Sequence, residues 1–419
     1  MVKINKWYMF ELKIMSCFED MKECEYEFSL IRKIIDATGP RLPCSQEEKI
    51  GAELLAKELS LLVGKPAIIE EFTTAPHASI GMIPIIGYIV LLVVLPLYYI
   101  STIISLILNI ILIIFALVQI FRYLAWFDFI FPKAISRNVY TILPAPSGTA
   151  KKTIILSAHI DSSWHCPVYE KNPHLAKPKL IYAVISVFLL CVLAFLKLSI
   201  MNSTIRLILD IIPLFFIPGF FILTRYLIYD KKKASPGAMD NLSGIALNTG
   251  ILKDFVEGKR SLHKDIQLIM VAFGSEEAAL KGSQDFVKRH KNDLLKNALV
   301  INVDSVSDID HFHIVVGDDW LGTKYDESLK KIAENAMNKV GISYTIIKNP
   351  AGGTDSASFS RANIKTITLA AQDGTPKNVY HTFNDRIEYL NPRTMILMKQ
   401  VVHEMIKEIQ ENLDSVFNL

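Results

Sequence analysis

Five short segments of this 419-residue chain carry the kinds of side chain that bind divalent metal ions. Each segment contains a histidine or an acidic residue, and most of them follow directly after an apolar run. The segments lie at residues 158–161, 237–241, 274–277, 303–305 and 380–382. Zinc accepts imidazole nitrogen and carboxylate oxygen, so these residue types indicate a metal-dependent hydrolytic site. The candidate residues are His159, Asp240, Glu276, Glu277, Asp304 and His381.

A set of this size suits two zinc ions, because one carboxylate can bridge two metals about 3.5–4 Å apart. A water shared between the metals would have its pKa lowered to about 7. A further carboxylate, bound to neither metal, must then take the proton of that water and return it to the leaving group. The adjacent pair Glu276 and Glu277 can supply one ligand and one base, and Asp161 can orient the imidazole of His159. Cobalt or manganese could occupy the same ligands.

Three apolar, β-rich segments precede these residues, at 152–157, 266–273 and 298–303. In open α/β sheets ligands bind beyond the carboxyl ends of the strands, so we expect the polar residues to meet at one edge. Strands at 67–72, 138–143 and 365–370 should complete the sheet, with helices at 45–62, 243–256, 283–292, 325–340 and 392–413. The sequence therefore predicts an α/β fold in which helices sandwich a mostly parallel, mixed sheet.

Between Glu71 and Arg122 the chain contains no Asp, Glu, Lys or Arg. As a single helix this stretch would rise roughly 75 Å, more than twice the thickness of the hydrocarbon core of a bilayer. We therefore expect two transmembrane helices at about 80–100 and 102–121, and a second pair at about 180–196 and 205–229. Within the fourth span, Asp210 is expected to pair with Arg206, four residues earlier on the same helix face.

The composition indicates which kinds of partner and which cellular compartment to expect. The net charge of +3 gives no indication of a nucleic-acid partner, whereas a hydrophobic content of 51% and a mean hydropathy of +0.31 indicate a lipid bilayer. Five scattered cysteines without a CxxC pair are typical of reduced thiols. The N-terminus lacks the pattern of a signal peptide, and Lys and Arg are concentrated on the domain side of the spans. An integral membrane protein with its α/β domain in the cytosol is expected.

The order of the motifs carries a resemblance. HxD, GAxDNxSG, EExxLxGS, a strand-terminal Asp and YHT together resemble metallopeptidase family 28, the co-catalytic zinc aminopeptidases. The resemblance implies that Asp240 bridges two zinc ions, that His159 and Asp304 complete one site, and that Glu277 and His381 complete the other. It implies further that Glu276 is the general base and that Tyr380 hydrogen-bonds the tetrahedral oxyanion. The chain departs from the family in having Ala279 before the leucine of the third motif and Arg386 after the last one. Asp355, in a loop that resembles one lining the pocket, is a weaker site candidate.

The resemblance also implies how the chain is divided. An N-terminal extension (1–24) precedes a catalytic domain in three parts (25–76, 127–178 and 231–419), which two transmembrane hairpins (77–126 and 179–230) interrupt. The second hairpin fills the 81-residue interval from His159 to Asp240. If strand 138–143 runs antiparallel to strand 152–157, both hairpins leave from the edge that carries the ligands, and the active site faces the membrane surface.

The expected function is that of a membrane-anchored dizinc exopeptidase, above all an aminopeptidase. Its substrate would be a peptide or amide near the membrane, and its oligomeric state stays open. Three alternatives also stay open: an amidohydrolase or carboxypeptidase acting on membrane-associated amides, a single-zinc glutaminyl cyclase, and a non-catalytic scaffold with the same fold.

Overall fold

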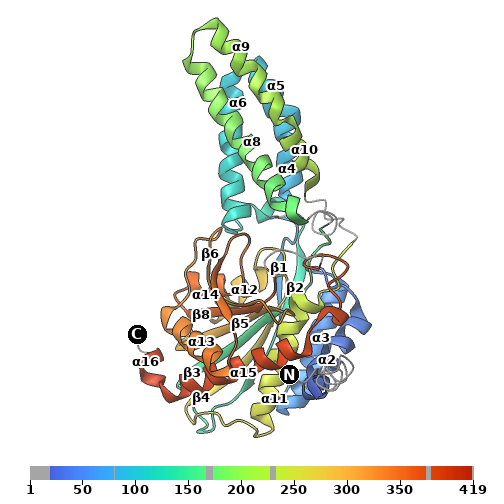
Figure 1. Ribbon diagram of the computed structural model, residues 1–419, viewed down its shortest axis with the longest axis vertical. Helices are drawn as coiled ribbons and strands as arrows, with labels where there is room; N and C mark the ends of the chain where they lie inside the picture. The colour runs from blue at the N-terminus through green and yellow to red at the C-terminus, as the bar shows by residue number, and fades with distance from the viewer. Residues whose placement is uncertain (1–18, 80, 167–172, 227–232, 374–378, 418–419) are drawn as a thin grey trace, which may run out of the picture.

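The chain forms an α/β domain from which a long bundle of apolar helices rises at one end (Figure 1). The computed structural model describes all residues except 1–18, 80, 167–172, 227–232, 374–378 and 418–419. The domain is assembled from three stretches of sequence, because the helices of the bundle are inserted after the first strand and after the third.

In the part of the chain that the structure describes, a mixed sheet of eight strands forms the centre of the domain, in the order β1-β2-β4-β3-β5-β8-β6-β7. The β4, β3, β5 and β8 strands are parallel neighbours, whereas β2 runs antiparallel to both β1 and β4. At the other end of the sheet, β6 is antiparallel to β8 and parallel to β7. The strands are β1 (Ile68–Thr74), β2 (Ala134–Leu143), β3 (Lys152–His159), β4 (Ile266–Phe273), β5 (Ala298–Val306), β6 (Phe312–Asp318), β7 (Tyr344–Asn349) and β8 (Lys365–Ala371).

Helices cover both faces of the sheet, which explains why the central strands are almost continuously apolar. On one face Leu156 of β3 belongs to a large core with five helices, and on the other face its neighbour Ile155 packs in a smaller core with α12 and α14. The five helices are α2 (Glu25–Thr38), α3 (Gln46–Val63), α11 (Gly244–Val256), α13 (Glu327–Val340) and α15 (Pro392–Glu411). The two on the smaller core are α12 (Lys281–His290) and α14 (Ser356–Arg361), and α16 (Leu413–Phe417) follows α15.

Four helices of the bundle are long and apolar enough to cross a membrane: 82–100, 102–121, 178–199 and 203–224. Only about a third of each is buried within the protein, and large apolar side chains such as Phe215 (70% exposed) point outward. Small residues allow close packing between the spans, since a Cβ on Gly87 would stand 2.6 Å from the backbone nitrogen of Thr224. The spans are built from α4 (Met82–Ile89), α5 (Leu95–Ile100), α6 (Thr102–Ala116), α8 (Pro173–Ser199), α9 (Ser203–Ile211) and α10 (Ile217–Tyr226), with short π or 3-10 segments between them.

The expected pair of Asp210 with Arg206 is wrong. Asp210 instead forms an ion pair of 2.5 Å with Lys197, at the end of the preceding span, while Arg206 is exposed. Lys197 is 9% exposed and its ammonium also lies 3.2 Å from the carbonyl oxygen of Tyr98. A buried ammonium needs a partner more than an exposed guanidinium does, which explains why Asp210 faces the neighbouring helix.

Strands 138–143 and 152–157 are not neighbours in the sheet, because β4 lies between β2 and β3. Sequence neighbours joined by a short turn need not be neighbours in a sheet, and here the parallel strand β4 takes the place. The direction of β2 is nevertheless as expected, and β2 begins at the edge where β3 and β4 end. The two hairpins therefore leave the domain from the same edge of the sheet.

Candidate metal centre

The side chains of the five predicted metal ligands converge at this edge of the sheet. His159 is the last residue of β3, and Asp304 lies near the end of β5. Glu277 follows β4, and Asp240 lies in the short helical segment Ala238–Ser243 that leads into α11. His381 comes from the loop before α15. Three strand ends and two loops thus supply one cluster, as the rule for open α/β sheets requires.

Asp240 occupies the centre of the cluster. Its Oδ1 lies 3.0 Å from Nε2 of His159 and its Oδ2 lies 3.1 Å from Nε2 of His381. The carboxylate thus presents one oxygen to each imidazole, which is the arrangement that a bridging ligand needs.

The remaining ligands divide into two groups around Asp240. Asp304 joins His159, with 4.0 Å between Oδ1 and Nε2, and Glu277 joins His381, with 3.2 Å between Oε1 and Nε2. In each group of three, the candidate ligand atoms all lie within 4.8 Å of one another. The grouping matches the one that the resemblance implied.

Burial and crowding set the charges in this cluster. Burial opposes the imidazolium form of both histidines, but the neighbouring carboxylates outweigh it and raise the pKa of His159 well above its usual value and that of His381 to about 10. Although burial acts against it, the two imidazoles lower the pKa of Asp240. Burial also raises the pKa of Asp304 to about 6. Several buried acids that share two imidazoles make a set of donors that fits divalent cations.

Glu276 lies beside the ligands without belonging to either group. Its side chain is buried, and its Oε2 lies 4.0 Å from Nε2 of His159. Burial raises its pKa well above the usual value, and the charges of Glu277, Asp355 and Asp304 raise it further. A carboxyl group with a raised pKa next to a metal cluster is suited to proton transfer near neutral pH.

Asp161 fixes the turn that carries Glu276 and Glu277. Its two carboxylate oxygens accept hydrogen bonds from the backbone N–H groups of Glu276 (3.1 Å) and Glu277 (3.0 Å). The imidazole of His159 meets the backbone carbonyl oxygen of Asp161 at 3.1 Å from Nδ1, whereas the nearest carboxylate oxygen is 3.5 Å away. Asp161 therefore contacts the imidazole as expected, mainly through its main chain, and its side chain positions both glutamates.

Comparison with known proteins points to one family. The family model described as Peptidase family M28 matches residues 229–406, a segment that contains all the predicted ligands except His159. The chain is similar to this family over that segment. Aminopeptidase YwaD of Bacillus subtilis is 26% identical over 197 residues, and the match spans 43% of this chain and 40% of that protein.

Solved structures share the fold of this chain. BSAP, a zinc aminopeptidase from Bacillus subtilis, superposes with a TM-score of 0.55 at 13% identity, covering 92% of this chain and 95% of that one. LapA aminopeptidase of Legionella pneumophila gives 0.53 at 11% identity, covering 94% and 71%. An Acidobacteriales glutaminyl cyclase gives 0.53 at 12% identity, covering 93% and 95%. Identities this low establish the fold alone.

The metal centre rests on two buried carboxylates that were not predicted from the sequence. Asp385 accepts hydrogen bonds from the backbone N–H groups of Met239 (2.6 Å) and Asp240 (3.2 Å), and burial raises its pKa to about 7. Glu48 of α3 accepts a hydrogen bond from the backbone N–H of Ser275 at 2.8 Å, directly before Glu276. Ser275 has a φ of +54°, so this bond holds a turn that a non-glycine residue rarely adopts. Asp385 follows His381 by four residues, which is the one signal that could have identified it.

Two weaker candidates lie beside the cluster. The ring of Tyr380 stacks on that of His381, with centroids 3.8 Å apart and planes 20° apart. Asp355 is buried, and burial followed by the charges around it raises its pKa to about 7. It is not among the atoms of either ligand group.

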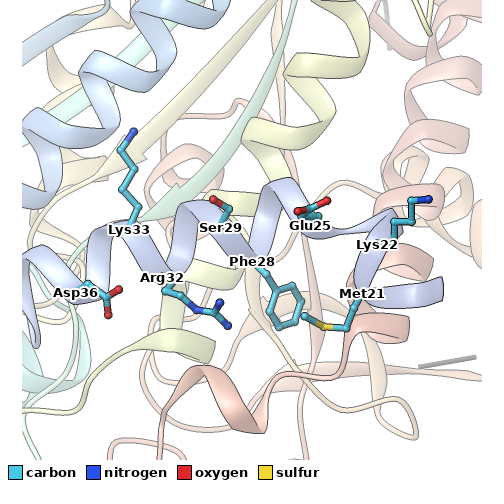
Figure 2. A pocket seen from close by; sticks show the side chains of 8 residues that line it. All are labelled: Met21, Lys22, Glu25, Phe28, Ser29, Arg32, Lys33 and Asp36. Atoms are coloured by element: carbon cyan, nitrogen blue, oxygen red, sulfur yellow. The ribbon is translucent and has the colours of Figure 1, made fainter. Parts of the chain in front are cut away.

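An open groove also runs along the outer face of α2, where Figure 2 shows Arg32, Lys33, Glu25 and Asp36 projecting around Phe28. Its lining carries both signs of charge and contains none of the predicted ligands. The groove has no evident part in the metal centre.

Proposed function

We propose that this chain is a membrane-anchored dizinc exopeptidase that removes residues from the N-termini of peptides. The observation that carries the proposal is the pair of ligand groups that share Asp240, with the unligated Glu276 beside them. Each group offers three donors, which leaves a coordination position for water or substrate in a tetrahedral site.

The residues of the chain would divide the reaction among themselves. Bound zinc would supply Lewis acidity, polarising the substrate carbonyl and making water ionise near neutral pH. Glu276 would accept the proton of the attacking water and pass it to the nitrogen of the leaving group. Asp161 would hold Glu276 and Glu277 in register, and Tyr380 would donate a hydrogen bond to the oxyanion that develops on the substrate.

The position of the helical bundle supports a site at the membrane surface. The segments on either side of the second hairpin meet in an antiparallel bridge between Trp164 and Ala234, five residues after His159 and six before Asp240. The first hairpin joins β1 to β2 at the same edge of the sheet. A substrate bound at the centre would therefore lie close to the bilayer. The excess of Lys and Arg on the domain side supports a cytosolic orientation.

A panel of peptides tests the proposal. Detergent-purified wild-type protein and a Glu276→Gln variant would be offered peptides with free and with acetylated N-termini, and the zinc content of both would be measured. We expect about two zinc ions per chain in each protein, cleavage of free N-termini only, and a loss of kcat of at least about a hundredfold in the variant.

The other outcomes separate the alternatives. Cleavage of acetylated peptides or from the C-terminus would indicate the amidohydrolase or carboxypeptidase. One zinc with cyclisation of N-terminal glutamine would indicate the cyclase, and absence of both zinc and activity would indicate a scaffold.

A further inference from the structure

The segment that leaves the first membrane hairpin is fixed to the turn of Glu276 and Glu277. Arg122 donates a hydrogen bond from Nη1 to the carbonyl oxygen of Leu321 at 2.8 Å. Six residues later, Asp128 forms an ion pair of 2.6 Å with the buried Lys281, which follows the turn directly. Between these two anchors the carbonyl oxygen of Tyr123 accepts a hydrogen bond from the side-chain amide of Gln284, on α12, at 3.4 Å.

Tyr123 lies on this segment and packs against the domain. Its ring packs with Leu280, Leu321 and Ala357. Its backbone has a φ of +52°, in the left-handed region that an aromatic residue rarely adopts, so the surrounding contacts must maintain this conformation.

The hydroxyl of Tyr123 lies beside the loop that contains Gly352 and Asp355. It stands 3.8 Å from the point that a Cβ on Gly352 would occupy, three residues before Asp355. No residue in the described part of the chain hydrogen-bonds this hydroxyl. A polar group held in place without a partner has a free donor to offer a ligand.

Burial and the neighbouring carboxylates determine whether the hydroxyl of Tyr123 stays protonated. Burial raises the pKa of the phenol, and the carboxylates of Glu276 and Glu277 raise it further. The hydroxyl therefore remains protonated at neutral pH and can donate a hydrogen bond. Leu280, on which the ring packs, donates a hydrogen bond from its backbone N–H to the carbonyl oxygen of Glu276 at 2.7 Å, so Tyr123 lies against the turn that carries Glu276 and Glu277.

We infer that Tyr123 is a substrate-binding residue, whose hydroxyl donates a hydrogen bond to a backbone carbonyl oxygen of the peptide held over the metal centre. The inference rests on the proposed function. It means that the membrane hairpin is a part of the active site as well as an anchor. Leu280 and Leu321 are buried, and the ring of Tyr123 packs against them, which keeps the residue in place.

A single-atom change tests this role. Tyr123→Phe removes the hydroxyl and keeps the ring that packs on Leu280. Tyr88→Phe is the matched control, because Tyr88 lies on α4 and is 52% exposed. For a peptide that the wild type cleaves, we expect kcat/KM to fall about tenfold in Tyr123→Phe, the loss of one hydrogen bond, and to stay unchanged in Tyr88→Phe. Both variants should retain the wild-type zinc content and melting temperature.

Binding of uncleaved inhibitors gives a second readout. A competitive peptide inhibitor that retains its backbone carbonyl groups should bind Tyr123→Phe about tenfold more weakly than it binds the wild type. A reduced-amide analogue lacks the carbonyl group at the bond normally cleaved. If that carbonyl is the acceptor, the analogue should bind Tyr123→Phe and the wild type with nearly equal affinity.

The failures of the two proposals are distinguishable. A wild-type protein that cleaves no peptide would overturn the proposed function, and the role of Tyr123 with it. An active wild type together with an equally active Tyr123→Phe variant that binds the inhibitor equally well would overturn the role of Tyr123 alone.

Discussion

Among single residues, the buried acids around Asp240 define what the site can do. Each has a distinct environment, and the environment separates their roles. Asp240 is held between two imidazoles and Asp161 between two backbone N–H groups, whereas Glu276 has like charges as neighbours. The environment of Asp240 favours a carboxylate that stays ionised, and that of Glu276 favours a carboxyl group that exchanges a proton.

The raised pKa of Glu276 predicts the acid limb of the activity. A general base acts only when ionised, so kcat/KM should fall as the pH is lowered through the pKa of Glu276. Because burial and neighbouring acids raise that pKa, the fall should begin above pH 4.5, the ordinary value for a glutamate. Bound cations would bring the limb down toward that value without changing its direction. The pH profile of kcat/KM on an uncharged peptide measures this, and a rate that is flat down to pH 4.5 would contradict it.

The sequence could indicate the ligands but not the residues that hold them. His159, Asp240, Glu277, Asp304 and His381 each follow or precede an element that the apolar pattern predicts, and the structure brings all five together. Glu48 and Asp385 act through hydrogen bonds to backbone N–H groups of residues far away in the chain, and such contacts leave no spacing in the sequence. Tyr123 was not predicted, because the sequence of its segment indicates only the end of a membrane span.

Secondary-structure elements were predicted best where the apolar pattern was strongest. The bounds of β4 are those expected, and the central strands β3, β5 and β8 differ from expectation only at their ends. Strand β7 was not predicted, because it lies at the sheet edge and half of its residues are exposed, so its apolar pattern is weak. Helix α2 was not predicted either. The position of β4 between β2 and β3 depends on long-range pairing, which a local pattern does not contain.

The ion pair between Asp128 and Lys281 connects the first hairpin to α12. The side chain of Lys281 is 5% exposed, so removing its partner by Asp128→Ala should lower the stability of the protein by about 3 kcal/mol. Adding Lys281→Met should restore part of the loss, because no buried charge then remains. Thermal unfolding of the two variants in detergent measures the difference.

An exposed pair provides the control for this prediction. Lys33 and Glu58 are 2.7 Å apart with side chains 44% and 20% exposed, so Lys33→Met should change stability by less than about 1 kcal/mol. If Asp128→Ala lowered stability no more than Lys33→Met does, the ion pair between Asp128 and Lys281 would not hold the hairpin to the domain.

For the whole molecule, the arrangement of bundle and domain determines where substrate can approach. The bundle rises from the edge of the sheet that carries the ligands (Figure 1), and in the proposed arrangement the domain presents this edge to the bilayer. The far end of the bundle holds the loop with Met201, which is 84% exposed. Domain and loop should therefore lie on opposite sides of the membrane.

Cysteine labelling tests this topology. In a background without the native cysteines, Met201→Cys should react with a membrane-impermeant maleimide applied to intact cells. Lys324→Cys, on the domain and 70% exposed at its side chain, should react only after the membrane is permeabilised. Labelling of Lys324→Cys in intact cells would place the catalytic domain outside, against the proposed orientation.

The most direct test of the account is anomalous X-ray diffraction at the zinc absorption edge, on crystals of detergent-purified protein. We expect two anomalous peaks about 3.5–4 Å apart, one beside His159 and Asp304 and the other beside Glu277 and His381, with Asp240 between them. A single peak, or none in protein purified with zinc present, would contradict the proposal of a dizinc centre.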